Sequence, residues 1–362
     1  DRVSSSASAW HVPMSRILSL ATALPPHRFT QEQIRDAFGA VCRGQRGIER
    51  LLPVFDRTGV ETRYFARPLE WYAEGQTFET RNDVYAECAL ELIERAARSC
   101  LRRAGVSPDQ IDHLYCVTTT GLTTPSLEAR LSRRLGLRPD ARRCPLFGLG
   151  CAGGAGALVR ASDVLRAYPG HRALVLSVEL CSLVFSPTAG TATDVIGVAL
   201  FGDGAAAVLL GGDDVSGPGP AVTQTRTHLF HEAPDLMGWR FTADGMRLIL
   251  ARGVPEFVGT TVKPVVEKFL MDQGLAIGDL HHLVLHPGGA KVMQTYQSAF
   301  GLPAGAVDNS REAMRQYGNQ SSASVLFMLH DLVASGRPVA GDSGLMMALG
   351  PGFSAEMLTL AW

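Results

Sequence analysis

The chain of 362 residues has no surplus of either charge, because 34 Lys and Arg residues face 35 Asp and Glu residues. Such a balance provides neither the basic surface that nucleic acids require nor the polybasic segment that an anionic membrane attracts. No stretch reaches the roughly 18 consecutive apolar residues of a membrane-spanning helix. We therefore expect no nucleic-acid partner and no integral membrane association.

Paired cysteines are also missing. The chain has 7 cysteines, but none stands in a C-x-x-C pair and no His lies at zinc-ligand spacing from them. A disulfide framework and a metal site are therefore not expected. Residues 1–13 lack the basic and apolar regions of a signal peptide, so we interpret them as a disordered tail and expect reduced thiols in the cytoplasm.

The composition is that of a folded chain. Hydrophobic residues make up 46% and charged residues 19% of the sequence, which excludes a disordered protein. The length suffices for one large domain or two of ordinary size.

An internal repeat defines the architecture. Residues 104–117 can be laid on residues 273–286 with a shift of 169, and each copy follows a predicted helix, at 82–104 and 255–273. The expected strands also recur, at 112–118 and 281–286, 173–178 and 343–348, and 205–210 and 355–360. We predict two similar α/β halves, 14–215 and 216–362, packed as a layered αβαβα sandwich.

Cys151 stands in the small-residue string Phe147-Gly-Leu-Gly-Cys-Ala-Gly-Gly154. The glycines favour a sharp turn and close approach to a ligand, before a helix that runs to about residue 165. The positive field of that helix N-terminus would lower the pKa of the thiol and make it nucleophilic. The alternative is a buried cysteine at a tight turn, but the number of small neighbours favours a nucleophile.

Two residues of the second half could assist this thiol. His286 ends a predicted strand before Pro287-Gly-Gly289 and could form a thiolate–imidazolium pair with Cys151. The repeat places Asn319 one residue from the counterpart of Cys151, where it would open a helix to about residue 332. Asn319 alone would be an ordinary helix N-cap, but beside Cys151 and His286 its amide could stabilise an oxyanion or enolate.

Two more glycine-rich strings are present, Phe201-Gly-Asp-Gly-Ala-Ala-Ala207 and Leu349-Gly-Pro-Gly352. Neither fits a dinucleotide fingerprint or a phosphate-binding loop. We interpret both as tight turns near a cavity.

Together these motifs resemble the type III polyketide synthases of the chalcone synthase family, which have the thiolase fold. The resemblance rests on Gly150-Cys-Ala-Gly-Gly154, Phe201-Gly-Asp-Gly204, His286-Pro-Gly-Gly289, Tyr317-Gly-Asn-x-Ser-Ser322 and Gly350-Pro-Gly352, and extends from about Ile17 to the C-terminus. The related β-ketoacyl-acyl carrier protein synthase III enzymes usually carry His-Gln-Ala-Asn where this chain has His286-Pro-Gly-Gly289, which favours the polyketide synthases.

The resemblance implies a mechanism. A starter acyl-CoA would acylate Cys151, and His286 and Asn319 would hold the thioester carbonyl of malonyl-CoA while CO2 leaves. No metal or organic cofactor would be needed, and the protein would be a homodimer. Arg50 and Arg57 match family positions that contact the CoA phosphates, although solvated arginines are an equally good interpretation.

The resemblance also identifies the substrate pocket. Phe201 matches the aromatic gatekeeper, and the remaining pocket positions are Thr119, Thr120, Thr124, Cys181, Leu248, Ser321, Gly350 and Pro351, with Thr124 at a wall shared by the dimer. Small and aliphatic residues suit an alkyl starter, as in bacterial alkylresorcinol and alkylpyrone synthases. We expect a fatty acyl starter and a resorcinol- or pyrone-type product, with a synthase that uses malonyl-CoA alone as the alternative.

Two other classes of protein compete with this interpretation. The order Cys, His, Asn also occurs in papain-like hydrolases, but their C-G-[SA]-C-[WY] signature is absent and Leu149 interrupts a G-x-C-x-G elbow. A non-catalytic scaffold is disfavoured because Cys151, His286 and Asn319 are all present.

Overall fold

The computed structural model describes residues 14–45, 47–185 and 191–362, so the predicted tail at residues 1–13 lies outside the described part. The main sheet has nine strands in the order β11-β12-β13-β8-β1-β7-β6-β4-β5. Their bounds are β1 Ser15–Ala23, β4 His113–Val117, β5 Arg142–Leu146, β6 Arg172–Leu180, β7 Asp203–Gly211, β8 Ala221–Leu229, β11 His282–Leu285, β12 Ser343–Gly350 and β13 Ser354–Ala361. Strands β1 and β8 pair over only two residue pairs, so the sheet is two smaller sheets joined at one corner.

The strand order confirms the internal repeat. In the first half β4 is parallel to β6, and β7 is antiparallel to both β6 and β1. In the second half β11 is parallel to β12, and β13 is antiparallel to both β12 and β8. The strands of the two halves therefore correspond one to one, and β5 is an additional edge strand of the first half.

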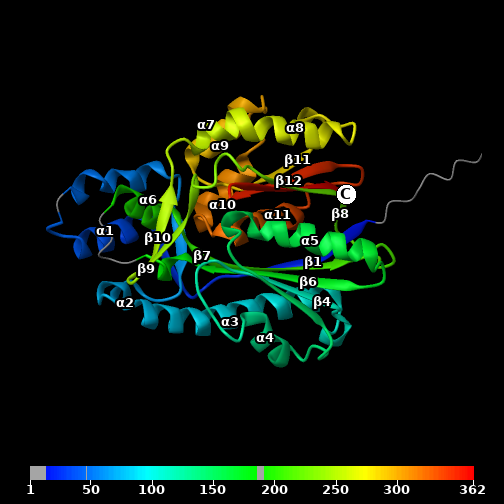
Figure 1. The fold of residues 1–362 in the computed structure, drawn as a ribbon, viewed down its shortest axis with the longest axis horizontal. Helices are drawn as coiled ribbons and strands as arrows, with labels where there is room; N and C mark the ends of the chain where they lie inside the picture. The colour runs from blue at the N-terminus through cyan, green and yellow to red at the C-terminus, as the bar shows by residue number, and fades with distance from the viewer. Residues whose placement is uncertain (1–13, 46, 186–190) are drawn as a thin grey trace, which may run out of the picture.

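The two sheets and their helices form five layers, which Figure 1 shows edge-on and which confirm the predicted αβαβα sandwich. Helices α3 Phe78–Ala104 and α4 Leu127–Leu135 cover the outer face of the first sheet. Helices α5 Gly153–Ala167 and α11 Ser324–Ala334 lie between the sheets. Helices α7 Val254–Phe257, α8 Lys263–Met271 and α9 Ala290–Ala299 cover the second sheet.

The two predicted outer helices differ from the sequence pattern at identifiable points. Helix α3 starts four residues earlier than predicted, because the Thr77 side chain accepts a hydrogen bond from the Thr80 amide and caps the helix. Its second-half counterpart is interrupted between α7 and α8 by a π-helical segment, Val258–Val262. Both helices are followed by a glycine with positive φ, Gly105 and Gly274.

The central layer is tightly packed because α5 is rich in glycine. A Cβ atom on Gly154 would lie 2.1 Å from the carbonyl oxygen of Ser322, just before α11. A Cβ atom on Gly153 would lie 2.5 Å from a methyl group of Val117. The glycines after Cys151 were predicted to allow close approach of a ligand. Gly153 and Gly154 instead allow close packing against Val117 and Ser322.

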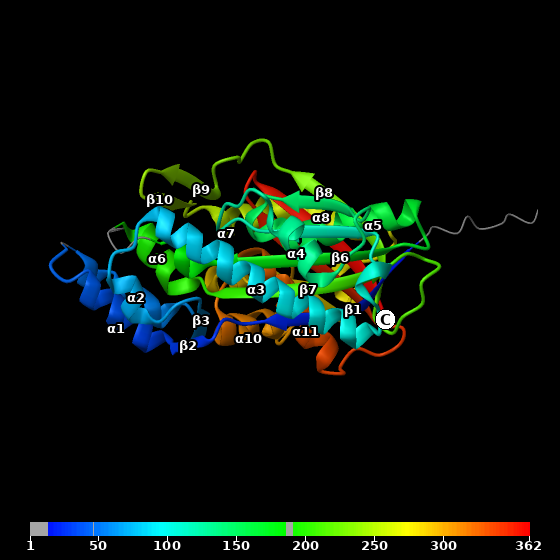
Figure 2. The same cartoon turned by 90° about the horizontal axis from the view of Figure 1, so that it is seen from below.

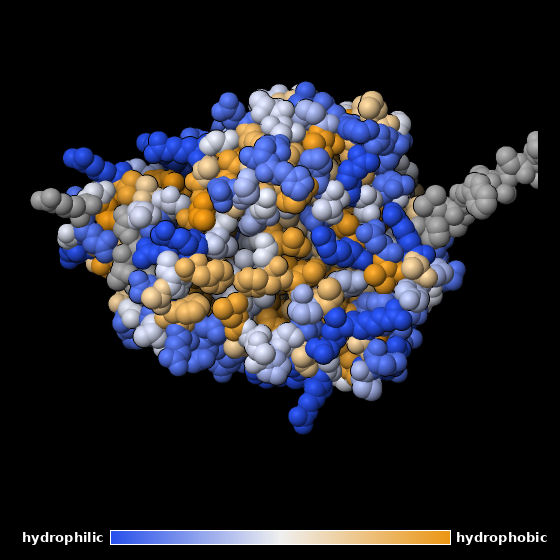
Figure 3. Space-filling model, viewed as in Figure 1, coloured by the Kyte–Doolittle hydropathy of each residue, from blue (hydrophilic) through white to orange (hydrophobic). Residues whose placement is uncertain are grey.

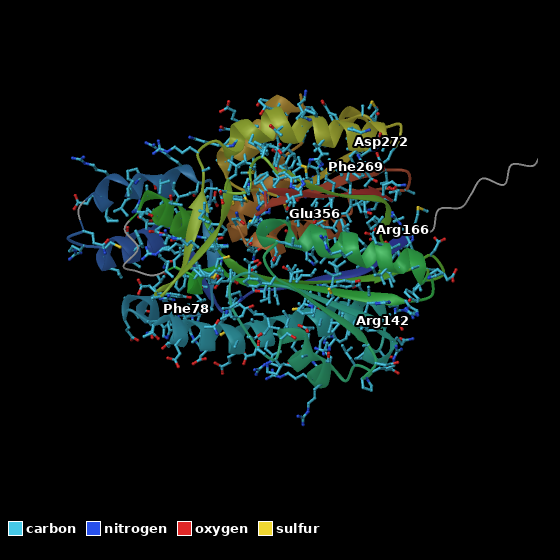
Figure 4. The ribbon with its side chains drawn as sticks, viewed as in Figure 1. Phe78, Arg142, Arg166, Phe269, Asp272 and Glu356 are labelled. Atoms are coloured by element: carbon cyan, nitrogen blue, oxygen red, sulfur yellow. The ribbon has the colours of Figure 1, made fainter. Side chains whose placement is uncertain are left out.

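A buried ion pair joins α5 to the second sheet. The Glu356 side chain, which Figure 4 labels, is fully buried on β13 and accepts a hydrogen bond from Arg160 of α5 at 3.0 Å. Thr227 of β8 also donates a hydrogen bond to it. These partners satisfy a carboxylate that would otherwise be costly to bury.

Smaller elements gather at one end of the molecule, on the left of Figures 1 and 2. They are β2 His27–Thr30, α1 Gln31–Val41, β3 Thr62–Phe65, α2 Leu69–Ala73, α6 Ala192–Leu200, β9 Met237–Thr242 and β10 Gly245–Leu250. Helix α10 Asp308–Tyr317 leads from α9 towards the central layer. Of the helices described, none is long and apolar enough to span a membrane.

Candidate active site

Cys151 lies in a short 3-10 turn, Gly150–Ala152, directly before α5. Gly150 opens this turn with φ 48°, a conformation that glycine adopts at little cost. The Cys151 thiol donates to the Ser321 hydroxyl, with 3.6 Å between sulfur and oxygen. Pro351 packs against Gly150, so the turn is enclosed by the Gly350-Pro351-Gly352 string of the second half.

Asn319 reaches the same place from a different backbone position than predicted. It forms a parallel bridge with Phe201, in which the Asn319 amide donates to the Leu200 carbonyl at 2.8 Å and the Gly202 amide donates to the Asn319 carbonyl at 3.0 Å. In the second half, the 3-10 turn that matches Gly150–Ala152 is Ser321–Ala323, which begins two residues after Asn319. The prediction that Asn319 opens a helix is therefore wrong.

The side chain of Asn319 is oriented by its own turn. Its Oδ1 atom accepts a hydrogen bond from the Ser321 amide at 2.8 Å, which leaves the side-chain N–H groups free to face the thiol. An interaction with this amide lowers the pKa of Cys151, although burial has the larger and opposite effect. The structure thus brings Asn319, Ser321 and Cys151 together.

His286 is buried at the end of β11. Its backbone amide donates to the Met347 carbonyl of β12 at 2.9 Å. Strand β12 ends at Gly350, which packs against Ala152, the residue after Cys151. Both ring nitrogens are buried without a hydrogen-bond partner in the described structure. Because such groups are costly to bury, they mark a position where a ligand could accept or donate a hydrogen bond.

The expected thiolate–imidazolium pair of Cys151 and His286 stays a prediction, and burial acts on both groups. Burial raises the pKa of the Cys151 thiol and lowers the pKa of the His286 imidazole, and both shifts favour the neutral form of the side chain. The described structure contains no hydrogen bond between the two side chains. Desolvation of the buried thiol therefore opposes the predicted depression of its pKa. Helix α5 itself starts two residues after Cys151, at Gly153.

A buried carboxylate that the sequence analysis missed lies beside the nucleophile. Glu179 is the penultimate residue of the apolar strand β6. It accepts hydrogen bonds from the Thr119 amide at 3.0 Å, the Thr120 hydroxyl at 2.8 Å and the Ser322 hydroxyl. Burial raises the pKa of Glu179 to about 7. An acidic residue inside an apolar strand was the available signal.

Phe201 belongs to an aromatic wall. Its ring centroid is 6.0 Å from Phe185 and 6.1 Å from Trp239, and those two rings are 5.9 Å apart. Trp239 pairs with Leu248 across β9 and β10, and Leu248 packs against the cluster that contains Phe201 and Cys181. Phe185 and Trp239 were not predicted as site residues, because the sequence alone does not show that their rings pack against Phe201.

The other predicted pocket residues occupy different environments. Thr119 and Pro351 line a cavity beneath β9 and β10, whereas the Thr120 hydroxyl is held by Glu179 and by the Leu180 amide. Thr124 is exposed on this chain. Arg50 and Arg57 are exposed too, and neither side chain has a hydrogen-bond or ion-pair partner in the described part of the chain.

One further side chain near the nucleophile was also missed. Tyr296 of α9 is fully buried with an unpartnered hydroxyl, and burial together with the nearby Cys151 raises its pKa. Among the described residues, no group of three or more His, Cys, Asp and Glu side chains could hold a metal ion.

Comparisons with known proteins agree with this arrangement. Residues 4–214 match the family model of chalcone and stilbene synthases, N-terminal domain, and residues 222–361 match that of the C-terminal domain. The 1,3,6,8-tetrahydroxynaphthalene synthase of Streptomyces peucetius subsp. caesius is 41% identical over 97% of this chain and 95% of its own length. The 3,5-dihydroxyphenylacetyl-CoA synthase of Amycolatopsis balhimycina is 31% identical over 96% and 93%.

A solved structure gives the same result. The 1,3,6,8-tetrahydroxynaphthalene synthase of Streptomyces coelicolor A3(2), a bacterial type III polyketide synthase, superimposes with a TM-score of 0.90 at 30% identity, covering 96% of this chain and 99% of its own.

The thiolase-type sandwich and its Cys-His-Asn site thus define a condensing acyltransferase. The chain belongs to the chalcone and stilbene synthase family and is a type III polyketide synthase. Cys151, His286 and Asn319 correspond to the catalytic triad of that family. A papain-like hydrolase and a scaffold are set aside.

Proposed function

We propose that this synthase uses a fatty acyl-CoA starter and malonyl-CoA extender units, and cyclises the chain to a resorcinol- or pyrone-type product. The observation that carries the proposal is an apolar cavity that Phe201 helps to line. Helices α1 and α2 and the end of α6 form its walls, with Ile34, Phe38, Phe65, Leu69, Val198 and Phe185 among the lining residues.

The lining of this cavity suits an alkyl chain. None of the described residues that line it is charged, and its two hydroxyl groups, on Tyr72 and Ser182, are bonded to each other at 2.6 Å. An aliphatic tail would gain about 25 cal/mol for each Å2 of apolar surface that it buries there. A flat polar starter would find no unsatisfied hydroxyl to bind.

We propose that Cys151 and His286 are both neutral before the reaction starts. As the Cys151 sulfur attacks the acyl-CoA carbonyl, its proton passes to neutral His286, and the proton then leaves with the CoA thiolate. His286 and Asn319 next donate hydrogen bonds to the malonyl thioester oxygen, which carries negative charge as CO2 departs. The resulting enolate carbon attacks the Cys151 thioester and releases the thiolate. We propose that no metal or organic cofactor takes part.

The remaining partner assignments are proposals of the same kind. Arg50 and Arg57, which have no side-chain partner among the described residues, would contact the CoA phosphates. The exposed apolar side chains of Leu122, Phe147 and Phe241 support a homodimer. The rings of Phe147 and Phe241 are 6.4 Å apart, and Figure 3 shows apolar residues gathered across the middle of one face of the molecule. No disulfide joins six of the cysteines in the described part of the chain, which supports a cytoplasmic location; they are Cys88, Cys100, Cys116, Cys144, Cys151 and Cys181.

The second candidate is a synthase that starts from malonyl-CoA, which the similarity to tetrahydroxynaphthalene synthases favours. A series of acyl-CoA starters from two to eighteen carbons, each supplied with malonyl-CoA, distinguishes the two by product mass. We expect alkylated products from the longer starters. Product from malonyl-CoA alone, with no incorporation of any acyl starter, would refute the fatty acyl proposal.

A single helix provides a matched test of the cavity. Ala37 of α1 lines the cavity, whereas Ala40 of the same helix is exposed and lies outside it. Ala37→Phe should shift the preferred starter to shorter chains, and Ala40→Phe should leave the preference unchanged. Identical chain-length profiles for both variants and the parent protein would place the alkyl tail elsewhere.

A further inference from the structure

The short strand β3 connects the two halves beside the active site. The Glu61 amide donates to the Arg315 carbonyl at 2.8 Å, and the Thr62 hydroxyl donates to the Gln316 carbonyl at 2.9 Å. Both carbonyls belong to the last turn of α10, where carbonyl groups lack partners within the helix. The next residues of the chain lead directly to Asn319.

Arg63, the next residue of β3, holds the other side of the site. Its side chain is fully buried, and Nη1 donates to the Phe201 carbonyl at 2.8 Å and to the Val198 carbonyl. These carbonyls lie at the C-terminal end of α6, which favours a positive charge. Nη2 donates to Gln31 at 2.6 Å, so the guanidinium group is fixed from two directions.

The aliphatic part of Arg63 packs against both strands of the catalytic bridge. A Cβ atom on Gly318 would lie 2.8 Å from the Arg63 Cδ atom, and one on Gly202 would lie 3.5 Å from its Cγ atom. Gly318 precedes Asn319 and Gly202 follows Phe201. Arg63 therefore contacts Phe201 and the glycine before Asn319, on both strands of the bridge between Phe201 and Asn319.

Stability alone is a poor explanation for this residue. A buried charge can often be replaced by an apolar side chain of similar volume without loss of folding free energy. Arg63 forms no ion pair within 4.0 Å in the described structure; its hydrogen bonds go to backbone carbonyls and to Gln31. A planar guanidinium group that bonds in two directions fixes geometry in a way that Lys or Met cannot.

We propose that Arg63 is a positioning residue for decarboxylation, because it keeps Phe201 and Asn319 in register so that the Asn319 amide faces Cys151. This inference rests on the proposed function of Asn319 in malonyl-CoA decarboxylation. Arg81 provides a matched control, because it is also buried and also donates to backbone carbonyls, those of Gln76 and of Asp244 in the turn between β9 and β10.

The test measures malonyl-CoA decarboxylation in a Cys151→Ala background, where no condensation occurs. Arg63→Lys should lower kcat about tenfold or more with KM within about threefold, and Arg81→Lys should stay within about twofold. Combining Arg63→Lys with Asn319→Ala should cost no more than Asn319→Ala alone, since a positioning residue acts through its target.

The outcomes separate the two hypotheses. If Cys151→Ala itself does not decarboxylate malonyl-CoA, the proposed mechanism fails. If it does, two results for a folded Arg63→Lys variant would overturn the assignment of Arg63. One is a decarboxylation kcat equal to that of Cys151→Ala alone, and the other is a loss that multiplies the loss caused by Asn319→Ala. Should Arg63→Lys not fold, Thr62→Val removes only the bond to the Gln316 carbonyl. That variant should lower kcat about threefold, and an unchanged kcat would equally overturn the assignment.

Discussion

The two halves share one strand order and one way of starting the central helix, yet they supply different chemistry. In the first half a turn opened by Gly150 at φ 48° presents the Cys151 thiol. In the second half the matching turn is opened by Ser321 at φ 49°, and the useful amide comes from Asn319, two residues before it. The comparison teaches that a duplicated backbone can divide a reaction, with the covalent step in one half and carbonyl binding in the other.

The largest expected effect tests this division directly. Cys151→Ala removes the proposed nucleophile and should abolish product formation, by more than about a thousandfold, while malonyl-CoA decarboxylation continues. His286→Ala and Asn319→Ala should each lose decarboxylation, because each removes a donor to the developing enolate. Release of CO2 and formation of product are measured separately.

A reversed result would contradict the division. If Cys151→Ala also lost decarboxylation while remaining folded, the thiol would serve both steps. Gln320 is buried between Asn319 and Ser321, and its side chain donates to the Asp203 carbonyl. It has no proposed role in nucleophilic attack or in decarboxylation.

Much of this arrangement could be predicted from the sequence, and the failures have physical causes. Helices and strands with apolar periodicity, and a repeat at constant spacing, are local patterns, so the sandwich and the regions of Cys151 and His286 were predicted. The register of Asn319 was not, because the spacing between the halves changes from 169 at β4 and β11 to 171 at the two turns. The protonation of the thiol depends on burial, and Arg63 acts through contacts distant in sequence.

The second prediction concerns the contact between the two central helices. In Gly154→Ala the new methyl group would lie 2.1 Å from the Ser322 carbonyl oxygen, so the halves must separate locally. Overpacking against backbone should reduce the free energy of unfolding by about 3 kcal/mol. Urea denaturation measures this loss.

Gly170→Ala is its matched control, because a Cβ atom there meets nothing within 4 Å. It should leave stability within about 0.5 kcal/mol of the parent protein. Equal stabilities for both variants would mean that the interface between the halves is not tightly packed at Gly154.

The third prediction uses the pH dependence of Glu179, whose hydrogen bonds join the first half to Ser322 of the second. Its folded pKa of about 7 lies above the ordinary 4.5, so its contribution to stability is fully present below pH 4.5 and is lost as the pH rises through 7. Between pH 5 and 8 this loss should be on the order of 2 kcal/mol.

Glu179→Gln should remove that share of the pH dependence. A glutamine can keep its carbonyl oxygen on the Thr119 amide and the Thr120 hydroxyl, while its amide group donates to the Ser322 hydroxyl. Asp203, whose pKa burial also raises to about 7, should keep a residual slope in the variant. An unchanged slope from pH 5 to 8 would show that Glu179 ionises freely in the fold.

The smallest expected effect distinguishes the two turns themselves. Ser321 is the one non-glycine residue with positive φ in the described chain, at the place where the first half has Gly150. Such a conformation costs a non-glycine residue roughly 1 kcal/mol, so Ser321→Gly should raise the free energy of unfolding by about 0.5 to 1 kcal/mol. The same change removes the hydroxyl that accepts from Cys151, so iodoacetamide should react with the thiol at a different rate. A more stable variant with altered thiol reactivity means that the second half retains a strained serine for the benefit of the nucleophile in the first. If stability falls instead, the hydroxyl contributes more to folding than the backbone strain costs, and the two turns differ for structural reasons.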